Sequence, residues 1–328
     1  MAGKKITELT QANAVTDSDL FIVETADGTC SIPYSEIKKM FQNMLETETN
    51  TGDTKSFPFV DCAASHNGIF RGKDLTNVYT IDEICERISD GTFEDLYIGD
   101  YFDITISTEY TANEVVRCIL AGFDTVPFYG DLNLGNNVYM NINKHHASIV
   151  TKNAFTKMHS LYDTESDPIT RGFDGSNLRS VLDTYGRALD TKLNNHIVPH
   201  MRIVSKYIDS AGVLKSVSDS GASSRYIISL LSERQIFGAS FYSNPEEHDG
   251  CSVFLPLFAL NPSAINCKCG GVNDIIKNSY GGFDSKGYWL INYADGKSEF
   301  CCLTPYISRV VFDIPYTKSG IRPYFLIG

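Results

Sequence analysis

The clearest periodic pattern in the chain is an apolar stripe between residues 176 and 198. Its apolar side chains recur at steps of three and four residues, which places them on one face of an α-helix. Pro199 follows directly and is typical of the end of a helix. The stripe therefore predicts an amphipathic helix over 176–198. Its members are Leu178, Leu182, Tyr185, Leu189, Leu193 and Ile197.

A shorter helix, over residues 81–89, is predicted by the signals at its two ends. Thr80 and Glu83 have the spacing of a capping box, in which each side chain accepts a hydrogen bond from the backbone of the other residue. Gly91 stands where a helix commonly ends in a left-handed residue. The two signals together define a short, well-capped helix.

Runs of β-branched and aromatic residues, separated by Gly, Asp and Ser, indicate strands. They dominate after the long stripe, so we expect an α+β domain with a β-rich C-terminal half. The last run ends on the last residues, 321–327, and predicts a strand held inside a sheet, because an unpaired terminus usually frays. The predicted strands are 96–107, 114–121, 137–142, 147–151, 225–231, 287–293, 298–303, 307–314 and 321–327.

Residues 1–45 have the pattern of one hairpin followed by one helix. The apolar runs 20–23 and 29–32 flank an Asp-Gly turn signal, and apolar residues at helical spacing follow. One hairpin and one helix cannot bury a core alone, so we expect this piece to contact other copies of the chain or a larger assembly. The expected contact residues are Ile6, Leu9, Phe21, Ile37 and Phe41.

A polar segment divides the chain into two parts. Residues 46–56 are turn-rich and predict a linker, which leaves 57–328 as the larger domain. The hydrophobic content of 42%, with 12% aromatic residues, supports a packed core in a segment of that length. We therefore expect a small N-terminal anchor followed by one large α+β domain.

Charge and cysteine content restrict the classes of partner. The formal net charge of −12 opposes a phosphate backbone, so we expect no nucleic acid. No run approaches the length of a transmembrane helix, so we expect no membrane insertion. Nine scattered cysteines, and a polar start without a signal peptide, indicate synthesis in a cytoplasm that keeps thiols reduced.

Candidate catalytic and metal-binding groups are present but match no motif. His145 and His146 are adjacent and would face opposite sides of a strand, so they are expected to be structural. The acidic segment 246–249 has the composition of a solvated loop. The spacings of Cys267, Cys269, Cys301 and Cys302 differ from those of structural zinc sites, and buried free thiols are expected. We therefore expect no catalytic residue, no cofactor and no metal.

The C-terminal segment mixes aromatic and polar residues closely. Trp289, the single tryptophan, is expected in the core because it lies in an alternating strand pattern. Tyrosine-rich polar surfaces are typical of recognition, since tyrosine offers a large contact area at low entropic cost. The predicted ligand-binding region therefore runs from about residue 292 to 318. Its candidate residues are Asn292, Tyr293, Tyr306, Arg309 and Tyr316.

Several short motifs occur in a specific order over residues 95–328. In this order the chain resembles a family of poorly characterised domains in bacterial surface proteins and in tailed phages of gut bacteria. The motifs begin at Asp100-Tyr101-Phe102, Cys118–Asp124, His145–Val150, Gly175–Arg179, Leu230–Glu233, Leu255–Leu260, Tyr288-Trp289-Leu290 and Gly320–Pro323.

The two ends of the chain extend this resemblance. Residues 5–10, followed by 19–23, are similar to the N-termini of phage tail and head fibre proteins. The C-terminal pattern is similar to the end of C-type lectin-like folds in phage receptor-binding proteins. Ile291 stands where the family commonly has arginine, which puts any arginine-dependent feature in doubt. The calcium and sugar triplets of C-type lectins are not visible, so no calcium site is expected.

The resemblance implies a phage virion protein, either a fibre or a receptor-binding component. Residues 1–45 would attach it to other virion proteins and assemble it as a homotrimer. Residues 57–328 would be a C-type lectin-like domain that binds a host cell-surface receptor, for example a glycan. Two alternatives stay open: a decoration or collar protein without a ligand, and a virion enzyme that acts on surface glycans.

Overall fold

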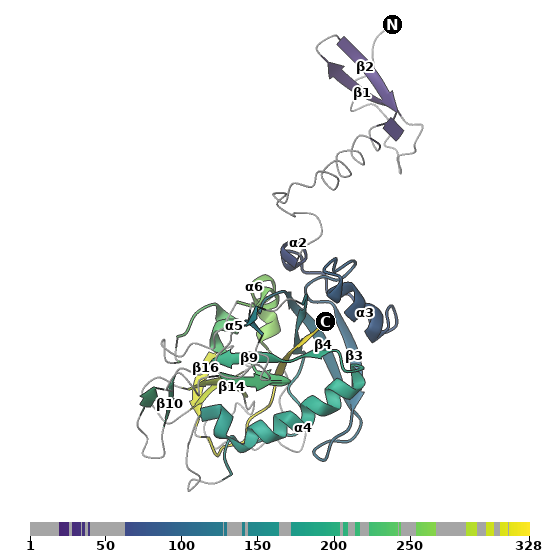
Figure 1. The fold of residues 1–328 in the computed structure, drawn as a ribbon. Helices are drawn as coiled ribbons and strands as arrows, with labels where there is room; N and C mark the ends of the chain where they lie inside the picture. The colour runs from purple at the N-terminus through teal and green to yellow at the C-terminus, as the bar shows by residue number, and fades with distance from the viewer. Residues whose placement is uncertain are drawn as a thin grey trace, which may run out of the picture. The chain divides into compact units, whose positions relative to one another are not determined.

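The computed structural model divides the chain into two compact units, residues 1–58 and 59–328 (Figure 1). The division falls two residues after the predicted linker. The structure describes residues 20–25, 28–33, 35–36, 39, 63–126, 128–129, 140–141, 144–163, 172–203, 206–208, 214–216, 223–241, 243, 254–266, 287–293, 300–304, 309–313 and 315–328.

The first unit contains the predicted hairpin. Strands β1 (Leu20–Thr25) and β2 (Gly28–Pro33) are antiparallel and, among the described strands, pair only with each other. Phe21 pairs with Ile32, whose side chain is only half-buried. Described residues 35, 36 and 39 are helical, in agreement with the helix expected after the hairpin. The other expected contact residues lie outside the described residues: Ile6, Leu9, Ile37 and Phe41.

The second unit is built on a sheet in which the C-terminal strand is central. The strand order is β13-β17-β7-β4-β3, all pairs are antiparallel, and β8 also pairs with β17. The prediction that the last strand is held inside a sheet is therefore confirmed. The strands are β3 (Tyr101–Ile106), β4 (Glu114–Phe123), β7 (Ala147–Thr151), β8 (Ile197–Val198), β13 (Ile228–Leu230) and β17 (Pro323–Ile327).

Helix α4 (Asn177–Lys192) carries the long apolar stripe, and the stripe residues up to Leu193 are buried. The predicted end at residue 198 is wrong. Asn194 and Asn195 take left-handed φ angles of 52° and 63°, which an α-helix cannot contain, and Ile197 pairs with Ile327 in the sheet. The hydrophobic period continued past the helix because Ile197 is buried by the sheet instead.

One face of the sheet carries large apolar side chains, and the other carries several buried hydroxyl groups. Cross-strand partners Leu120, Ile149 and Phe325 share one face with Ile228, which lies against Gly186 of α4. Adjacent positions face the other way and carry hydroxyl groups. There the Ser148 hydroxyl bonds the Thr125 hydroxyl at 2.6 Å and the Tyr324 hydroxyl at 2.9 Å, while Ser229 bonds His200 at 3.0 Å.

Helix α3 (Ile81–Ser89) forms as predicted. Thr80 Oγ1 accepts a hydrogen bond from Glu83 N, and a Glu83 carboxylate oxygen accepts one from Thr80 N at 2.7 Å. Gly91 has a φ of +74°, a left-handed conformation that favours glycine. A Cβ there would lie 2.4 Å from His145 Nε2, which is a second reason for glycine.

Most of the remaining described strands lie after residue 199 and form small sheets, in agreement with the predicted β-rich C-terminal half. Strands β14 (Tyr288–Tyr293), β15 (Phe300–Thr304) and β16 (Arg309–Asp313) are antiparallel neighbours. The predicted strand 96–107 is too long, because a turn occupies its first residues. The others are β5 (Phe128–Tyr129), β6 (Met140–Asn141), β9 (His200–Ile203), β10 (Lys206–Ile208), β11 (Leu214–Ser216) and β12 (Ser223–Tyr226).

Short helices complete the second unit. Helix α5 begins with a second capping box between Ser232 and Gln235 and ends at Gly238, whose φ is +76°. The side-chain amide of Asn67 in α2 bonds the backbone of Phe123 as a neighbouring strand would. Its Nδ2 donates to Phe123 O, and its Oδ1 accepts from Phe123 N. The short helices are α2 (Ala63–Asn67), η3 (Gly172–Gly175), α5 (Glu233–Phe237), α6 (Pro256–Leu260) and η4 (Pro262–Ile265).

Arg322 is a buried cation at the start of β17. Its guanidinium donates to the carbonyl oxygens of Thr151 at 2.8 Å, Ile265 at 3.1 Å and Ala264 at 2.7 Å, and to the Tyr288 hydroxyl at 3.3 Å. These partners belong to β7, η4 and β14. One side chain therefore fixes three segments that are distant in sequence. Trp289, next to Tyr288, is fully buried as predicted.

We expect Arg322→Met to lower the free energy of unfolding by about 3 kcal/mol or more, because the carbonyl groups of Thr151 and Ala264 lose their guanidinium donor and that of Ile265 keeps the Tyr288 hydroxyl. Denaturant titration followed by Trp289 fluorescence measures the change. Arg187→Met is the matched control: Arg187 is exposed on α4, and its replacement should change stability by less than about 0.5 kcal/mol. Equal effects of the two substitutions would contradict the structural role of Arg322.

Candidate functional site

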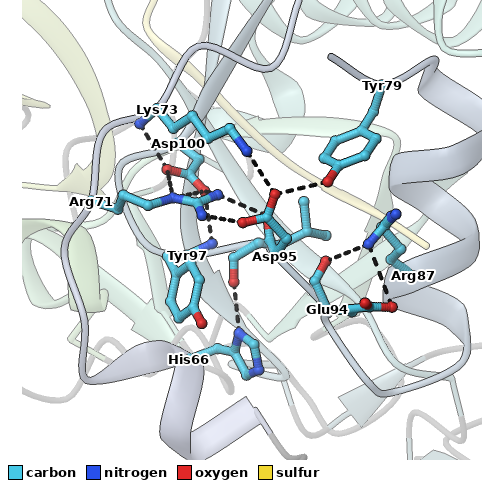
Figure 2. A network of polar contacts seen from close by, with 10 residues as sticks. His66, Arg71, Lys73, Tyr79, Arg87, Glu94, Asp95, Tyr97 and Asp100 are labelled. Atoms are coloured by element: carbon cyan, nitrogen blue, oxygen red, sulfur yellow. Dashed lines mark hydrogen bonds and ion pairs between the residues drawn. The ribbon is translucent and has the colours of Figure 1, made fainter. Parts of the chain in front are cut away.

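A network of charged and aromatic side chains occupies the two loops that precede β3 (Figure 2). We call it the Asp95 network and define it as Arg71, Lys73, Tyr79, Asp95 and Asp100. The first three residues come from the segment that leads into α3, and the two carboxylates come from the segment between α3 and β3. The network thus joins two loops that flank one helix.

Asp100 is the buried end of the network. Its side chain is 0% exposed, and it accepts hydrogen bonds from Arg71 Nη2 at 2.6 Å, Lys73 N at 2.8 Å and Tyr97 N at 2.9 Å. A buried carboxylate needs such partners, because an unpaired one would carry a large desolvation penalty. Asp100 is therefore a structural residue that fixes both loops.

Asp95 is the partly exposed end, with 34% of its side chain accessible. Its carboxylate accepts hydrogen bonds from Lys73 Nζ at 2.6 Å, from Tyr79 Oη at 2.7 Å and from Arg71 Nη1. Its backbone carbonyl also accepts one from Arg71 Nη2 at 2.7 Å. Arg71 therefore bridges the exposed carboxylate and the buried one.

The backbone around Asp95 is strained. Phe93 and Asp95 both have a φ of 51°, a region that residues other than glycine rarely adopt. The burial of the Phe93 ring and the hydrogen bonds of Asp95 hold this conformation. Gly99, with a φ of +86°, is required as well, because a Cβ there would lie 2.3 Å from the Phe70 ring. Such strain clusters at ligand-binding and active sites.

Aromatic rings surround the charged groups. The Arg71 guanidinium lies 4.6 Å from the centre of the Tyr97 ring, and His66 stacks on the same ring at 5.0 Å. Arg87 lies 4.3 Å from the centre of the Tyr79 ring. His66 is itself fixed by a 2.7 Å hydrogen bond between Nδ1 and the carbonyl oxygen of Leu96. The rings restrict the cations to one arrangement.

The network shifts the pKa values of its members in opposite directions. Partial burial alone would raise the pKa of Asp95, but the hydrogen bonds from Lys73, Arg71 and Tyr79 outweigh it and hold that pKa far below its usual range. Burial alone would lower the pKa of Arg71, and the two carboxylates raise it instead. The hydrogen bond to Asp95 raises the pKa of Tyr79.

These shifts define what the network can do. Asp95 stays ionised and Arg71 stays charged at every physiological pH, so neither is suited to proton transfer. The exposed edges of Asp95 and Lys73 offer a fixed acceptor beside a fixed donor, which suits polar recognition. Ile69, Phe70 and Val78 are exposed apolar residues of the same segment. Arginine, tyrosine and exposed apolar groups together are typical of binding surfaces.

The structure places the predicted ligand-binding residues in different environments. Asn292 is 3% exposed, and its Oδ1 accepts a hydrogen bond from Glu233 N at 2.7 Å. That position is structural, so Asn292 is corrected from a surface residue to a core residue. It is buried because β14 packs beside the start of α5, where an amide oxygen satisfies a helix N–H group.

Three of the other predicted ligand-binding residues lie on described elements. Tyr293 ends β14 and pairs with Phe300, while Arg309 starts β16 and pairs with Thr304. Tyr316 is half-buried in a turn before β17. Tyr306 lies outside the described residues. Tyr293 and Arg309 thus lie on the two outer strands of the sheet β14-β15-β16, with β15 between them.

The paired histidines directly precede β7 and lie outside any strand, so the expected opposite faces of a strand do not apply to them. His145 is half exposed, and its Nδ1 lies 2.7 Å from an Asp124 carboxylate oxygen. His146 is buried, and its Nε2 accepts a hydrogen bond from Val126 N at 3.1 Å. Burial lowers the pKa of His146, so its ring is neutral near pH 7. Both residues hold the turn after β4 rather than share one ligand.

Cys302 is buried, as predicted, and its thiol lies 3.4 Å from the Ser319 hydroxyl. Cys85 and Cys118 are buried as well, and neither forms a disulfide. Burial raises the pKa of the Cys85 thiol to about 12, which makes it unreactive near neutral pH. No group of three or more His, Cys, Asp or Glu side chains is arranged to hold a metal ion in the described part of the chain. The acidic loop 246–249, Cys267 and Cys269 lie outside it.

The Asp95 network was not among the predicted sites. The chain holds many Asp, Lys and Arg residues, and nothing in their spacing shows that residues 71 and 95 meet. The capping box and Gly91 predicted a helix that ends near residue 90, and the polar loop after it was the only available signal. The left-handed φ of Asp95 leaves no signature in the sequence.

No protein-family model, curated protein or solved structure matches this chain. The case for a function therefore rests on the geometry of its own residues. In the described part of the chain, no helix is long and apolar enough to cross a membrane.

We expect Asp95→Asn to lower the free energy of unfolding by about 1 kcal/mol, because Arg71 and Lys73 lose a charged partner at a partly exposed site. Asparagine tolerates the left-handed conformation, so the substitution tests charge rather than backbone strain. Thermal unfolding measures the change, which should shrink at 1 M salt. Glu94→Gln is the control, since that exposed carboxylate makes one 3.6 Å ion pair, and an equal loss would contradict the prediction.

Proposed function

We propose that this chain is a phage virion protein, a head or tail fibre component that displays a host-surface-binding domain. Residues 1–45 attach it to other virion proteins and drive assembly, and the large unit binds the receptor. The activity proposed is binding and not turnover. The observation that carries the proposal is the division of the chain into a small hairpin unit and a large unit with its own core.

The hairpin unit supports the attachment role. A two-stranded sheet that pairs only with itself is at best marginally stable in water, and it gains stability by contact with other chains. Ile32 remains half-buried within a single chain, which leaves apolar surface for such contacts. A homotrimer fits the role of a fibre, because several weak contacts with one cell surface add to a strong attachment.

The large unit supports the display role. Its C-terminal strand is central in the sheet and its C-terminal half is rich in strands, in keeping with the proposed C-type lectin-like domain. The sheet is a rigid frame on which surface segments can vary. The proposed receptor is a cell-surface molecule, with a glycan as the leading class because the candidate surfaces combine tyrosines with fixed polar groups.

Two surfaces are candidates for the receptor contact. The first is the segment of about residues 293–318, which includes Tyr293, Tyr306, Arg309 and Tyr316. The second is the Asp95 network with its exposed apolar neighbours. The first was proposed from residue types, and the second is favoured by its preformed geometry, since a rigid site loses little entropy on binding.

We expect the full-length chain to be a trimer and residues 59–328 alone to be monomeric, because the hairpin unit supplies the contacts between chains. Light scattering at micromolar concentration measures both masses. The large unit has its own buried core and should stay folded, which circular dichroism checks. A monomeric full-length chain would contradict the oligomeric part of the proposal, and a trimeric fragment would move the contacts to the large unit.

We expect the labelled full-length chain to bind the surface of at least one strain in a panel of gut bacteria. The fragment 59–328 should bind the same strain about 10²-fold more weakly, since it lacks multivalency. Flow cytometry with a concentration series measures both. Binding to no strain would favour the decoration alternative, and release of reducing sugar from the cell walls would favour the enzyme alternative.

The same binding measurement separates the two surfaces. Tyr316→Ala should weaken binding by about tenfold or more if the C-terminal segment contacts the receptor, as interface tyrosines commonly do. Asp95→Asn should have that effect if the Asp95 network does. Arg187→Met, on the exposed face of α4, is the control for both. Loss of binding with neither substitution would exclude both surfaces.

A further inference from the structure

Two segments that are far apart in sequence form a short clasp beside Trp289. His159 N donates to Ser319 O at 3.0 Å, and Ser319 N donates to His159 O at 3.1 Å. Leu161 N adds a 2.8 Å bond to Pro315 O. The His159 carbonyl also accepts the indole N–H of Trp289 at 2.8 Å. The clasp thus fixes the turn 315–319, which carries Tyr316, against the core.

The side chain of His159 is half-buried. It contacts the Tyr110 ring edge-on at 4.9 Å and the Tyr185 ring at 6.4 Å between centres. Its Nε2 is buried and has no hydrogen-bond partner within the part of the chain that the structure describes. Neutral imidazole tolerates that position, whereas imidazolium would bring an N–H donor and a charge with no acceptor.

The two lysines near His159 act in the same direction as burial. Lys157 precedes it on the same segment and Lys318 lies on the opposite segment of the clasp, and both disfavour a second positive charge. Tyr110 and Tyr185 face it from the β3–β4 loop and from α4. Both are neutral near pH 7, since the ordinary pKa of tyrosine is about 10 and burial raises it further. Glu114 of β4 lies near Tyr185, and its Oε1 accepts a hydrogen bond from Thr156 N at 2.6 Å.

We propose that His159 makes the clasp between residues 159–162 and 315–319 acid-sensitive, so that acidification releases the turn that carries Tyr316. The closed clasp excludes the protonated ring, and the open clasp accepts it in water. Release would leave the central sheet intact and would free the indole N–H of Trp289 from its carbonyl partner. The device is independent of what the large unit binds.

The direction of the pH effect follows from linkage. Burial, together with Lys157 and Lys318, lowers the pKa of His159 from its ordinary 6.5 to about 4. Between these two values only the open form binds the proton, so stability that is present above pH 6.5 is lost as the pH falls toward 4. From pH 7 to 4.5 the opening equilibrium constant should rise roughly 50-fold.

Hydrogen-exchange mass spectrometry of the full-length chain tests this proposal. Peptides over 157–162 and 315–320 should show that roughly 50-fold rise after correction for the intrinsic pH dependence of exchange. The substitution His159→Phe keeps an aromatic ring without a titratable nitrogen and should abolish the rise. The emission of Trp289, the single tryptophan, provides a second readout of the same opening.

Two controls define the outcomes that would overturn the proposal. Peptides from the paired strands β7 and β17 report global unfolding, and an equal loss of protection there would replace the local clasp by general acid denaturation. A rise in His159→Phe as large as in the parent chain would also overturn it. If that variant does not fold, Lys157→Gln/Lys318→Gln, at two exposed positions, should reduce the rise, and an unchanged rise would overturn the proposal.

Discussion

The hydrogen bonds of the buried Arg322 guanidinium are the interaction on which the large unit most depends. They join the end of β7, the short helix η4 and the start of β14 to the strand that closes the sheet. The partners from β7 and η4 are carbonyl groups, which a sheet or helix leaves unpaired at its terminus, and the partner from β14 is the Tyr288 hydroxyl. Arginine can satisfy several at once, because its donors form a rigid planar fork that stays charged.

This arrangement differs from the usual pairing of a buried cation with a carboxylate. The described partners of Arg322 are neutral oxygens, and the rings of Phe258 and Tyr288 lie 5.7 Å and 5.4 Å from its guanidinium carbon. Several dipoles and two aromatic faces together replace one counter-charge. The cost of burying the cation is offset only while all the segments are in place, which makes the local fold cooperative.

The two main helices could be predicted from the sequence, because their signals depend on residues close together in the chain. The capping box at Thr80 and Glu83 and the stripe from Leu178 to Leu193 depend on neighbours within a few residues, so their prediction was accurate. The end of α4 was missed because Ile197 continues the helical period although a sheet buries it. Asn292 was misplaced because a polar residue in a strand is read as exposed unless its partner, here the backbone of Glu233, is known.

Long-range pairing explains what the sequence could not show. Arg71 meets Asp95 and Asp100 across α3, and His159 meets Ser319 across half the chain, and neither pair has a signature in spacing. The protein places two titratable groups, Asp95 and His159, in opposite environments. Around Asp95 the charge is surrounded by donors, so its pKa falls and the loops keep their shape in acid. Around His159 the charge is excluded, so acid acts on the clasp before it acts on the Asp95 network. As the pH falls, His159 is protonated before Asp95, because the pKa of Asp95 is held far below its usual range.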